Sequence, residues 1–173
     1  LVCMQPKSLL RLPQAASRLA EFTHGGFQSV IDDPFAAQHR EEVRRLVFCT
    51  GKMYYDLALA PDRNPQVALV RIEELYPWPH HAVQQMLERY PAIEQVVWAQ
   101  EEPKNQGAWT YVQPRLRASA GAALGVRYVG RPERASPAEG HMDAHQAEQA
   151  RIVATVMRVD EGADLRTPVG TPV

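Results

Sequence analysis

The chain contains 173 residues, of which 45% are hydrophobic, and this is enough for one domain with a substantial core and attached arms. Acidic and basic residues nearly cancel to a formal net charge of -1, which argues against a protein that coats nucleic acid, because such a domain is markedly basic. No segment approaches the roughly 20 consecutive apolar residues of a membrane span. The N-terminal run LVCMQPKSLLR is unlike a signal peptide, since its basic residues follow the apolar stretch. We therefore expect a cytoplasmic globular protein with neither a nucleic-acid nor a membrane partner.

The N-terminal quarter of the chain has the pattern of an arm. Residues 1–5 are strand-like and are broken by Pro6, residues 14–22 are weakly helical, and the stretch to residue 42 is rich in turn-forming residues. We interpret residues 6–42 as an arm without a core. A chain that opens inside a strand and continues into an arm is expected to be a piece of a longer protein.

The two cysteines each lie in an apolar run, Cys3 in LVCM and Cys49 in LVFCT. Free cysteines of this kind are usually buried, so we expect two reduced, buried thiols. Their spacing matches neither a disulfide framework nor a zinc site.

Strands and helices alternate from Val43 onward. The apolar and helical periodicities predict strands at 43–50, 67–75, 94–102 and 126–130, and helices at 52–60, 80–90, 108–120 and 141–157. This alternation predicts an α/β fold of three layers, with a mostly parallel sheet and helices on both faces. Pro114 is expected in a first helical turn or at a kink, and Asp143 is expected to cap the last helix. Residues 158–173 are expected to form a flexible tail.

Four basic residues follow the predicted strands at corresponding ends: Lys52, Arg71, Lys104 and Arg131. Open α/β sheets bind ligands at the carboxyl ends of their strands, so these side chains are candidates to converge on one anionic ligand. The alternative is that each is a surface charge or a salt-bridge partner.

Other motifs near these positions favour ordinary structural roles. Thr50-Gly51-Lys52 lacks the first glycine and the final hydroxyl of a Walker phosphate loop. Glu101 and Glu102 are adjacent and alternate in facing along a strand, so we expect one to form a salt bridge and the other to be solvated. His141 and His145 lie four apart but lack the sequence of a zinc-binding helix.

Long blocks of the sequence resemble one known family. They are VFCTGKMYYDL, VALVRIEELYPWP, VVWAQEEPKNQGAW and RYVGRPERASPAEGHMDAHQAEQ, with PKSLLR near the start. Together they are similar to the C-terminal region of the first, decarboxylating component of the 2-oxoglutarate dehydrogenase complex, over roughly residues 1–157. The resemblance implies a transketolase-like plan. Within it, 1–13 is the last strand and exit of the pyrimidine-binding domain, 14–42 a connecting arm, 43–157 the C-terminal domain and 158–173 a tail.

The resemblance also implies what the chain contributes. The whole enzyme uses thiamine diphosphate and Mg²⁺ and passes a succinyl group to the lipoyl arm of a dihydrolipoyl succinyltransferase. Because the GDG cofactor motif is absent from this sequence, no catalytic residue, cofactor-binding residue or metal ligand is carried over. In this family the domain supports the homodimer and can bear a regulatory site for acetyl-CoA or an AMP-type nucleotide.

The resemblance bears on the candidate residues as well. Lys52, Arg71, Lys104 and Arg131 all lie inside the matching blocks, and Arg115 and Arg117 could join them from the following helix. Two alternatives remain open, a free-standing nucleotide or acyl-CoA binding module and a protein-interaction domain. A parent enzyme that prefers 2-oxoadipate is equally compatible with this sequence.

Overall fold

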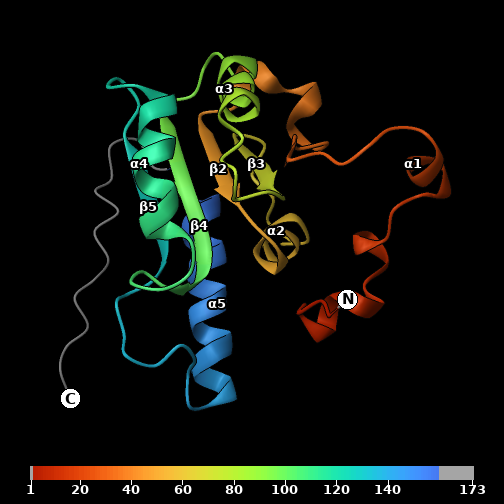
Figure 1. The fold of residues 1–173 in the computed structure, drawn as a ribbon. Coiled ribbons are helices and arrows are strands. Elements are labelled where there is room, and N and C mark those ends of the chain that lie inside the picture. The colour runs from red at the N-terminus through yellow and green to blue at the C-terminus, as the bar shows by residue number, and fades with distance from the viewer. Residues whose placement is uncertain (1, 160–173) are drawn as a thin grey trace.

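The computed structural model describes residues 2–159 and contains one five-stranded sheet flanked by helices (Figure 1). The strands are β1 (Val30–Ile31), β2 (Arg45–Cys49), β3 (Val67–Ile72), β4 (Gln95–Pro103) and β5 (Val126–Arg131). The α-helices are α1 (Leu19–Thr23), α2 (Lys52–Ala58), α3 (His80–Arg89), α4 (Trp109–Ala120) and α5 (Met142–Met157). Short 3-10 turns occupy Lys7–Arg11, Pro13–Ala15, Ala36–Gln38 and Arg40–Glu42.

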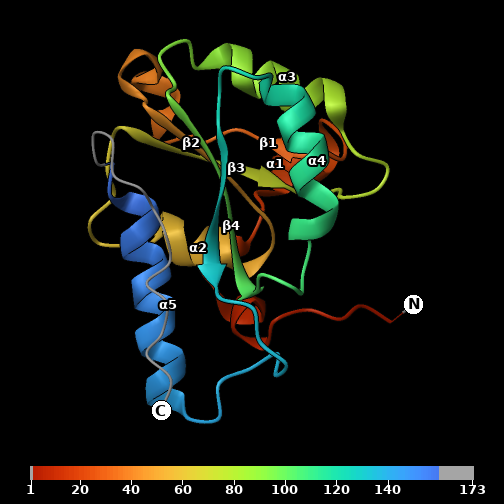
Figure 2. The same cartoon turned by 90° about the vertical axis from the view of Figure 1, so that its left-hand side faces the viewer.

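The sheet is mostly parallel, as the alternation of strands and helices predicts. Its strand order is β1-β3-β2-β4-β5; β2, β3, β4 and β5 are parallel to their neighbours, and β1 is antiparallel to β3. Helices α3 and α4 cover one face, and α2 and α5 cover the other (Figure 2). The predicted three-layer α/β fold is confirmed.

The central strands are buried on both faces, so the core consists of two clusters separated by the sheet. In β2, Leu46 and Phe48 pack in the cluster under α3 and α4, whereas Val47 and Cys49 pack in the cluster under α2 and α5. Successive side chains of a strand point to opposite faces, and a continuous apolar run therefore fills both clusters at once. Trp98 of β4 is the largest fully buried side chain.

Arg45 joins the sheet to the end of α5. Its side chain is only 1% exposed. Nη1 donates to the carbonyl oxygens of Thr155 at 3.0 Å and Val156 at 2.9 Å, while Nε and Nη2 donate to Oε1 of Gln95 at 3.0 and 2.7 Å. The last carbonyls of a helix lack partners within the helix and carry partial negative charge. The arginine satisfies two of them and complements that charge.

The arm differs from its sequence interpretation at both ends. The strand predicted at residues 1–5 does not form over the described residues 2–5, which have no pairing partner. Conversely, the interpretation of the arm as free of core is wrong for Val30 and Ala36, which are buried in the α3–α4 cluster. Between these ends the chain stands away from the sheet (Figure 1). The exposed large apolar side chains of residues 2–29 are Val2, Met4, Leu10, Leu19, Phe22 and Phe27.

Asp33 fixes the arm to the edge of the sheet. Its carboxylate, in a residue only 2% exposed, accepts hydrogen bonds from Nη2 of Arg63 at 2.5 Å and from the backbone N–H of Leu69 at 2.8 Å. A third hydrogen bond, of 2.9 Å, comes from the N–H of Phe35. A buried carboxylate is tolerated only when it is paired and hydrogen-bonded, and all three donors belong to the arm or to the edge of the domain.

Cys3 and Cys49 should differ in reactivity. Cys49 is buried as predicted, but the prediction for Cys3 is wrong, because the extended N-terminal segment leaves it exposed. Burial raises the pKa of the Cys49 thiol to about 12, and only a thiolate reacts rapidly. We expect an aromatic disulfide reagent to titrate one thiol in the native protein at pH 8 and two in denaturant. Cys3→Ser should abolish the native reaction, and rapid release of two equivalents from the native chain would contradict the burial of Cys49.

The remaining sequence predictions concern Pro114, Asp143, membrane spans and the tail. Pro114 lies inside α4 and not in its first turn. Asp143 lies in the first turn of α5, whose cap residue is His141. None of the helices in residues 2–159 is long and apolar enough to cross a membrane. Of the predicted tail, residues 160–173 lie outside the described part of the chain.

Candidate functional site at the carboxyl ends of the strands

The strand order creates a topological switch point between β2 and β4. The chain leaves β2 for α2 on one face of the sheet and leaves β4 for α4 on the other. In open α/β sheets, the crevice outside the carboxyl ends at such a point is where ligands bind. Lys52 follows β2 and Glu101 lies near the end of β4, so both lie at this edge of the sheet.

Lys52 and Glu101 form an ion pair across the switch point. The lysine Nζ is 3.0 Å from Oε2 of Glu101 and 2.5 Å from Oδ2 of Asp56, one turn along α2. Partial burial alone would lower the pKa of Lys52, but the hydrogen bonds to Asp56 and Glu101 outweigh it and raise that pKa above its ordinary value. The lysine is therefore a cation at any physiological pH.

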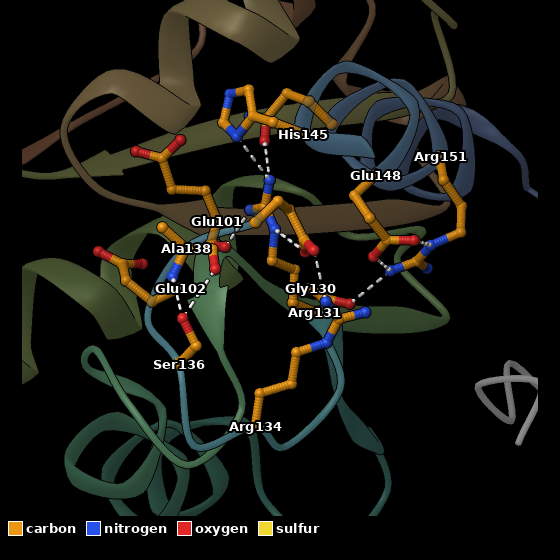
Figure 3. Close-up of polar contacts among 12 residues, drawn as sticks. Glu101, Glu102, Gly130, Arg131, Arg134, Ser136, Ala138, His145, Glu148 and Arg151 are labelled. Carbon is orange, nitrogen blue, oxygen red and sulfur yellow. Dashed lines mark hydrogen bonds and ion pairs between the residues drawn. The ribbon is translucent and has the colours of Figure 1, made fainter. Parts of the chain in front are cut away.

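Arg131, at the end of β5, is only 3% exposed. Figure 3 shows that it lies beside Glu101. Its Nη1 donates to the backbone carbonyl of Glu101. Nη2 lies 3.3 Å from both Nδ1 of His145 and Oε1 of Gln149, on α5. Nε lies 3.4 Å from Oε1 of Glu139 in the β5–α5 loop. Three separate elements thus surround one guanidinium.

A shared set of partners links Lys52 to Arg131. Gln149 contacts Arg131 through Oε1 and donates from Nε2 to Oδ2 of Asp56 at 2.7 Å. Asp56 in turn pairs with Lys52, and Glu101 accepts from Lys52 through its carboxylate and from Arg131 through its carbonyl. We call Lys52, Asp56, Glu101, Arg131 and Gln149 the cation ring.

The structure confirms the prediction for the two adjacent acids. Glu101 forms the salt bridge to Lys52, whereas Glu102 is exposed and turns its side chain to solvent. The alternation of side chains along β4 separates the two carboxylates.

The other two predicted cations lie apart from the cation ring. The Nη1 of Arg71 donates to the hydroxyl of Tyr55 at 2.7 Å, its Nε is 2.7 Å from Oε1 of Glu73, and its guanidinium lies 4.8 Å from the centre of the Tyr54 ring. Lys104 is exposed and contributes its backbone N–H to the carbonyl of Arg131.

The two arginines of α4 also lie outside the cation ring. Arg115 folds over the Tyr111 ring at 3.7 Å from its centre and donates to the carbonyl of the same residue. Arg117 is exposed. The structure therefore brings together Lys52 and Arg131 out of the candidate cations.

Gln100 shapes the crevice and was missed by the sequence analysis. It is 2% exposed. Its Oε1 accepts from Nε1 of Trp98 at 2.8 Å and from the N–H of Trp109 at 3.1 Å, while its Nε2 donates to the carbonyl of Gln106 at 2.8 Å and to two others in the same turn. Every donor and acceptor of the amide is used. The available signal was an amide directly after the apolar run of residues 96–99.

A pocket of about 410 Å³ opens at the same strand ends on the α3–α4 side. Thr50 and Glu102, which follow β2 and end β4, line it beside the aromatic rings of Tyr76 and Tyr111. Tyr76 is 82% exposed. The lining is mostly apolar with few polar groups, which is the usual character of a small-molecule pocket. It lies across the strand ends from the cation ring.

The β5–α5 loop adds two more charges next to the ring. Nη1 of Arg134 is 2.6 Å from Oε2 of Glu139, and the side chain of Glu139 is 9% exposed. Glu139 thus faces both Arg134 and Arg131. Neither Arg134 nor Glu139 is recognisable as a site residue in the sequence, because nothing in the local pattern indicates that a loop acid folds back on a strand-end arginine.

Comparison with known proteins finds a matching family and several similar relatives. The family model described as 2-oxoglutarate dehydrogenase C-terminal matches residues 16–157. Similar relatives include proteins named 2-oxoglutarate dehydrogenase E1 component from Exiguobacterium sp. (46% identical over 164 residues, 92% of this chain) and Geobacillus kaustophilus (46% over 164 residues, 93%). Another is that of Staphylococcus aureus strain N315 (41% over 160 residues, 91%). The chain spans 17% of the length of each of these relatives.

The matched range covers the whole sheet and every helix from α1 to α5. The resemblance predicted from the sequence blocks is therefore confirmed by two kinds of comparison that agree. The chain belongs to the 2-oxoglutarate dehydrogenase C-terminal family, and it is similar to the E1 component of that enzyme.

Proposed function

We propose that this chain is the structural and regulatory C-terminal domain of a 2-oxoglutarate dehydrogenase first component, and that it binds an anionic effector of the AMP or acetyl-CoA type at its strand ends. The observation that supports the effector site is the cation ring. Two buried or half-buried cations, Lys52 and Arg131, are linked through shared partners at the strand ends, and a pocket with aromatic walls opens at the same strand ends on the other face of the sheet. Such a pocket suits a flat base or an acyl group, and cations at the same strand ends suit phosphate oxygens.

The decarboxylation is assigned by this proposal to the remainder of the enzyme. Residues 2–159 contain no group of three or more His, Cys, Asp or Glu side chains that could hold a metal ion. We assign the Mg²⁺ and the thiamine diphosphate of the family to the remainder of the enzyme as well. The named relatives are about six times longer than the match. In the proposed setting the domain works in the cytoplasm beside its own dimer mate and the dihydrolipoyl succinyltransferase.

The exposed apolar arm supports a role in assembly. Phe22 and Phe27 are each 76% exposed and Met4 is 93% exposed. Contiguous apolar side chains that face solvent mark surfaces that bind protein. We assign them to contacts with the rest of the enzyme or with the dimer mate. A self-associating interaction domain is the second candidate, and sedimentation velocity between 1 and 100 μM distinguishes it by a rise in sedimentation coefficient with concentration.

Titration of AMP and of acetyl-CoA into the purified chain tests the effector site. We expect saturable heat from at least one ligand, and a loss of affinity of about tenfold or more in Lys52→Gln, because a charge-assisted contact to phosphate is removed. Arg131→Ala should have a larger effect, with its fold checked by circular dichroism. Arg117→Ala removes an exposed arginine of α4 and serves as the control.

Two results would count against the effector site. One is absence of heat with both ligands in the wild-type chain. The other is an equal change of affinity in Lys52→Gln and in Arg117→Ala, since this would mean that only the overall charge matters.

A further inference from the structure

The contacts of Arg131 with its neighbours are loose for a buried cation. Among the described residues, the guanidinium of Arg131 has four partners. Three of them, the side chains of His145, Gln149 and Glu139, lie 3.3 or 3.4 Å from its nitrogen atoms. Glu139 is the carboxylate that faces it, yet Oε1 of Glu139 is buried and makes no hydrogen bond. Charged hydrogen bonds between nitrogen and oxygen are normally about 2.7–2.9 Å long. The guanidinium therefore has a carboxylate in place without the geometry of a tight pair.

Glu139 is carried by a segment with few attachments of its own. Upstream, the backbone of Arg134 is fixed to the β4–α4 turn, with its N–H 3.1 Å from Oδ1 of Asn105 and its carbonyl 2.9 Å from Nδ2 of the same side chain. Downstream, α5 begins at Met142. Residues 135–138 between them are exposed and form no helix or strand. The carboxylate sits on a short exposed span between two fixed points.

We propose that Glu139 acts as an internal competitor for the effector, its carboxylate occupying the position that a phosphate group of the ligand takes between Arg131 and Arg134. A phosphate offers three acceptor oxygens and binds two guanidinium groups in the fork geometry that a single carboxylate oxygen fails to satisfy here. Binding displaces the carboxylate, and residues 135–140 move away from the strand ends. This regulation rests on the proposed effector function, because Arg131 belongs to both.

The charges around the site agree with this exchange. Arg131, Arg134 and Lys52 face three carboxylates, those of Glu139, Glu101 and Asp56, in the resting structure. The Glu101 carboxylate belongs to Lys52, at 3.0 Å. Displacing Glu139 leaves the two arginines for the incoming anion while the lysine keeps its partner, so one phosphate replaces one carboxylate without leaving a buried charge unpaired.

Thermal melting of the chain in inorganic phosphate, at constant ionic strength set with chloride, tests the exchange. Glu139→Gln should melt lower than the wild type without phosphate. With phosphate it should rise by about 4 °C more than the wild type, corresponding to an apparent Kd about tenfold tighter. Glu133→Gln changes the same charge on an exposed residue of the same loop and should behave as the wild type. Glu139→Asp, which keeps the charge but shortens the side chain, should lie between.

The outcomes separate this inference from the effector proposal. Equal phosphate responses in Glu139→Gln and Glu133→Gln would overturn the competitor role, even if the wild-type chain binds AMP or acetyl-CoA. A phosphate response confined to Glu139→Gln would support it, even if neither of those two ligands binds the wild type. Hydrogen exchange provides a second measurement, because the backbone amides of residues 135, 136 and 138–140 should exchange faster when phosphate is added to the wild type. Unchanged or slower exchange at saturating phosphate would also overturn the displacement.

Discussion

Replacing Arg45 by alanine should lower the free energy of unfolding by about 3–5 kcal/mol, the usual cost of removing one member of a buried charged network. The change deprives the carbonyls of Thr155 and Val156 of their donor and leaves Oε1 of Gln95 without its two hydrogen bonds. It also removes a positive charge from the negative end of α5. Urea denaturation followed by circular dichroism at 222 nm measures the loss.

Arg44→Ala is the matched control for this change. The neighbouring side chain is 39% exposed and its ion pair with Glu94 spans 3.8 Å, so its removal should cost less than about 1 kcal/mol. If Arg45→Ala costs no more than Arg44→Ala, then the sheet does not hold α5 through this arginine.

Gly130→Ala should be destabilising by about 2–4 kcal/mol, because the position has no room for a methyl group. A Cβ there would lie 2.3 Å from the hydroxyl of Tyr128 and 2.8 Å from the backbone carbonyl of Gln100. The tyrosine can move, but the carbonyl belongs to the central part of β4. The neighbouring β5 must therefore shift, and the carbonyls of Glu102 and Arg131 would lose the Tyr128 hydroxyl.

Two variants test the steric explanation. Gly125→Ala introduces a methyl group just before β5 where no atom lies within 4 Å, and it should change stability by less than about 0.5 kcal/mol. Combining Tyr128→Ala with Gly130→Ala should cost less than the sum of the two single changes, because one clash is already relieved. Additive costs in that cycle would show that the loss comes from elsewhere.

The sheet was predictable from the sequence because its signal is local. In β2 and β4 an apolar run of strand length is followed by a turn and a periodic helix, and each pattern requires only neighbouring residues to be recognised. The arm has no such signal. Val30 and Ala36 are buried because β3 lies beside them, and this pairing joins segments about 40 residues apart. The exposure of Cys3 also depends on which distant segments pack against it, and the local sequence does not reveal this.

The candidate site was only partly predictable. Strand-end positions predicted that Lys52 and Arg131 lie at one edge of the sheet, and the structure links them there through Asp56, Glu101 and Gln149. Arg71 ends β3 at the same edge, yet its partners are two tyrosines and Glu73. The choice among partners depends on side-chain packing between elements. Glu139 illustrates this, because its position is set by the return of a loop over β5.

The carboxylate of Asp33 has a consequence for how the sheet meets other molecules. An edge strand with open N–H groups is a template on which another chain can add a strand and start aggregation. At the β3 edge, the N–H of Leu69 is already taken by Asp33, and those of Glu73 and Glu74 point to the carbonyl of Ser29. The two-residue β1 and the buried Asp33 therefore protect this edge against intermolecular pairing.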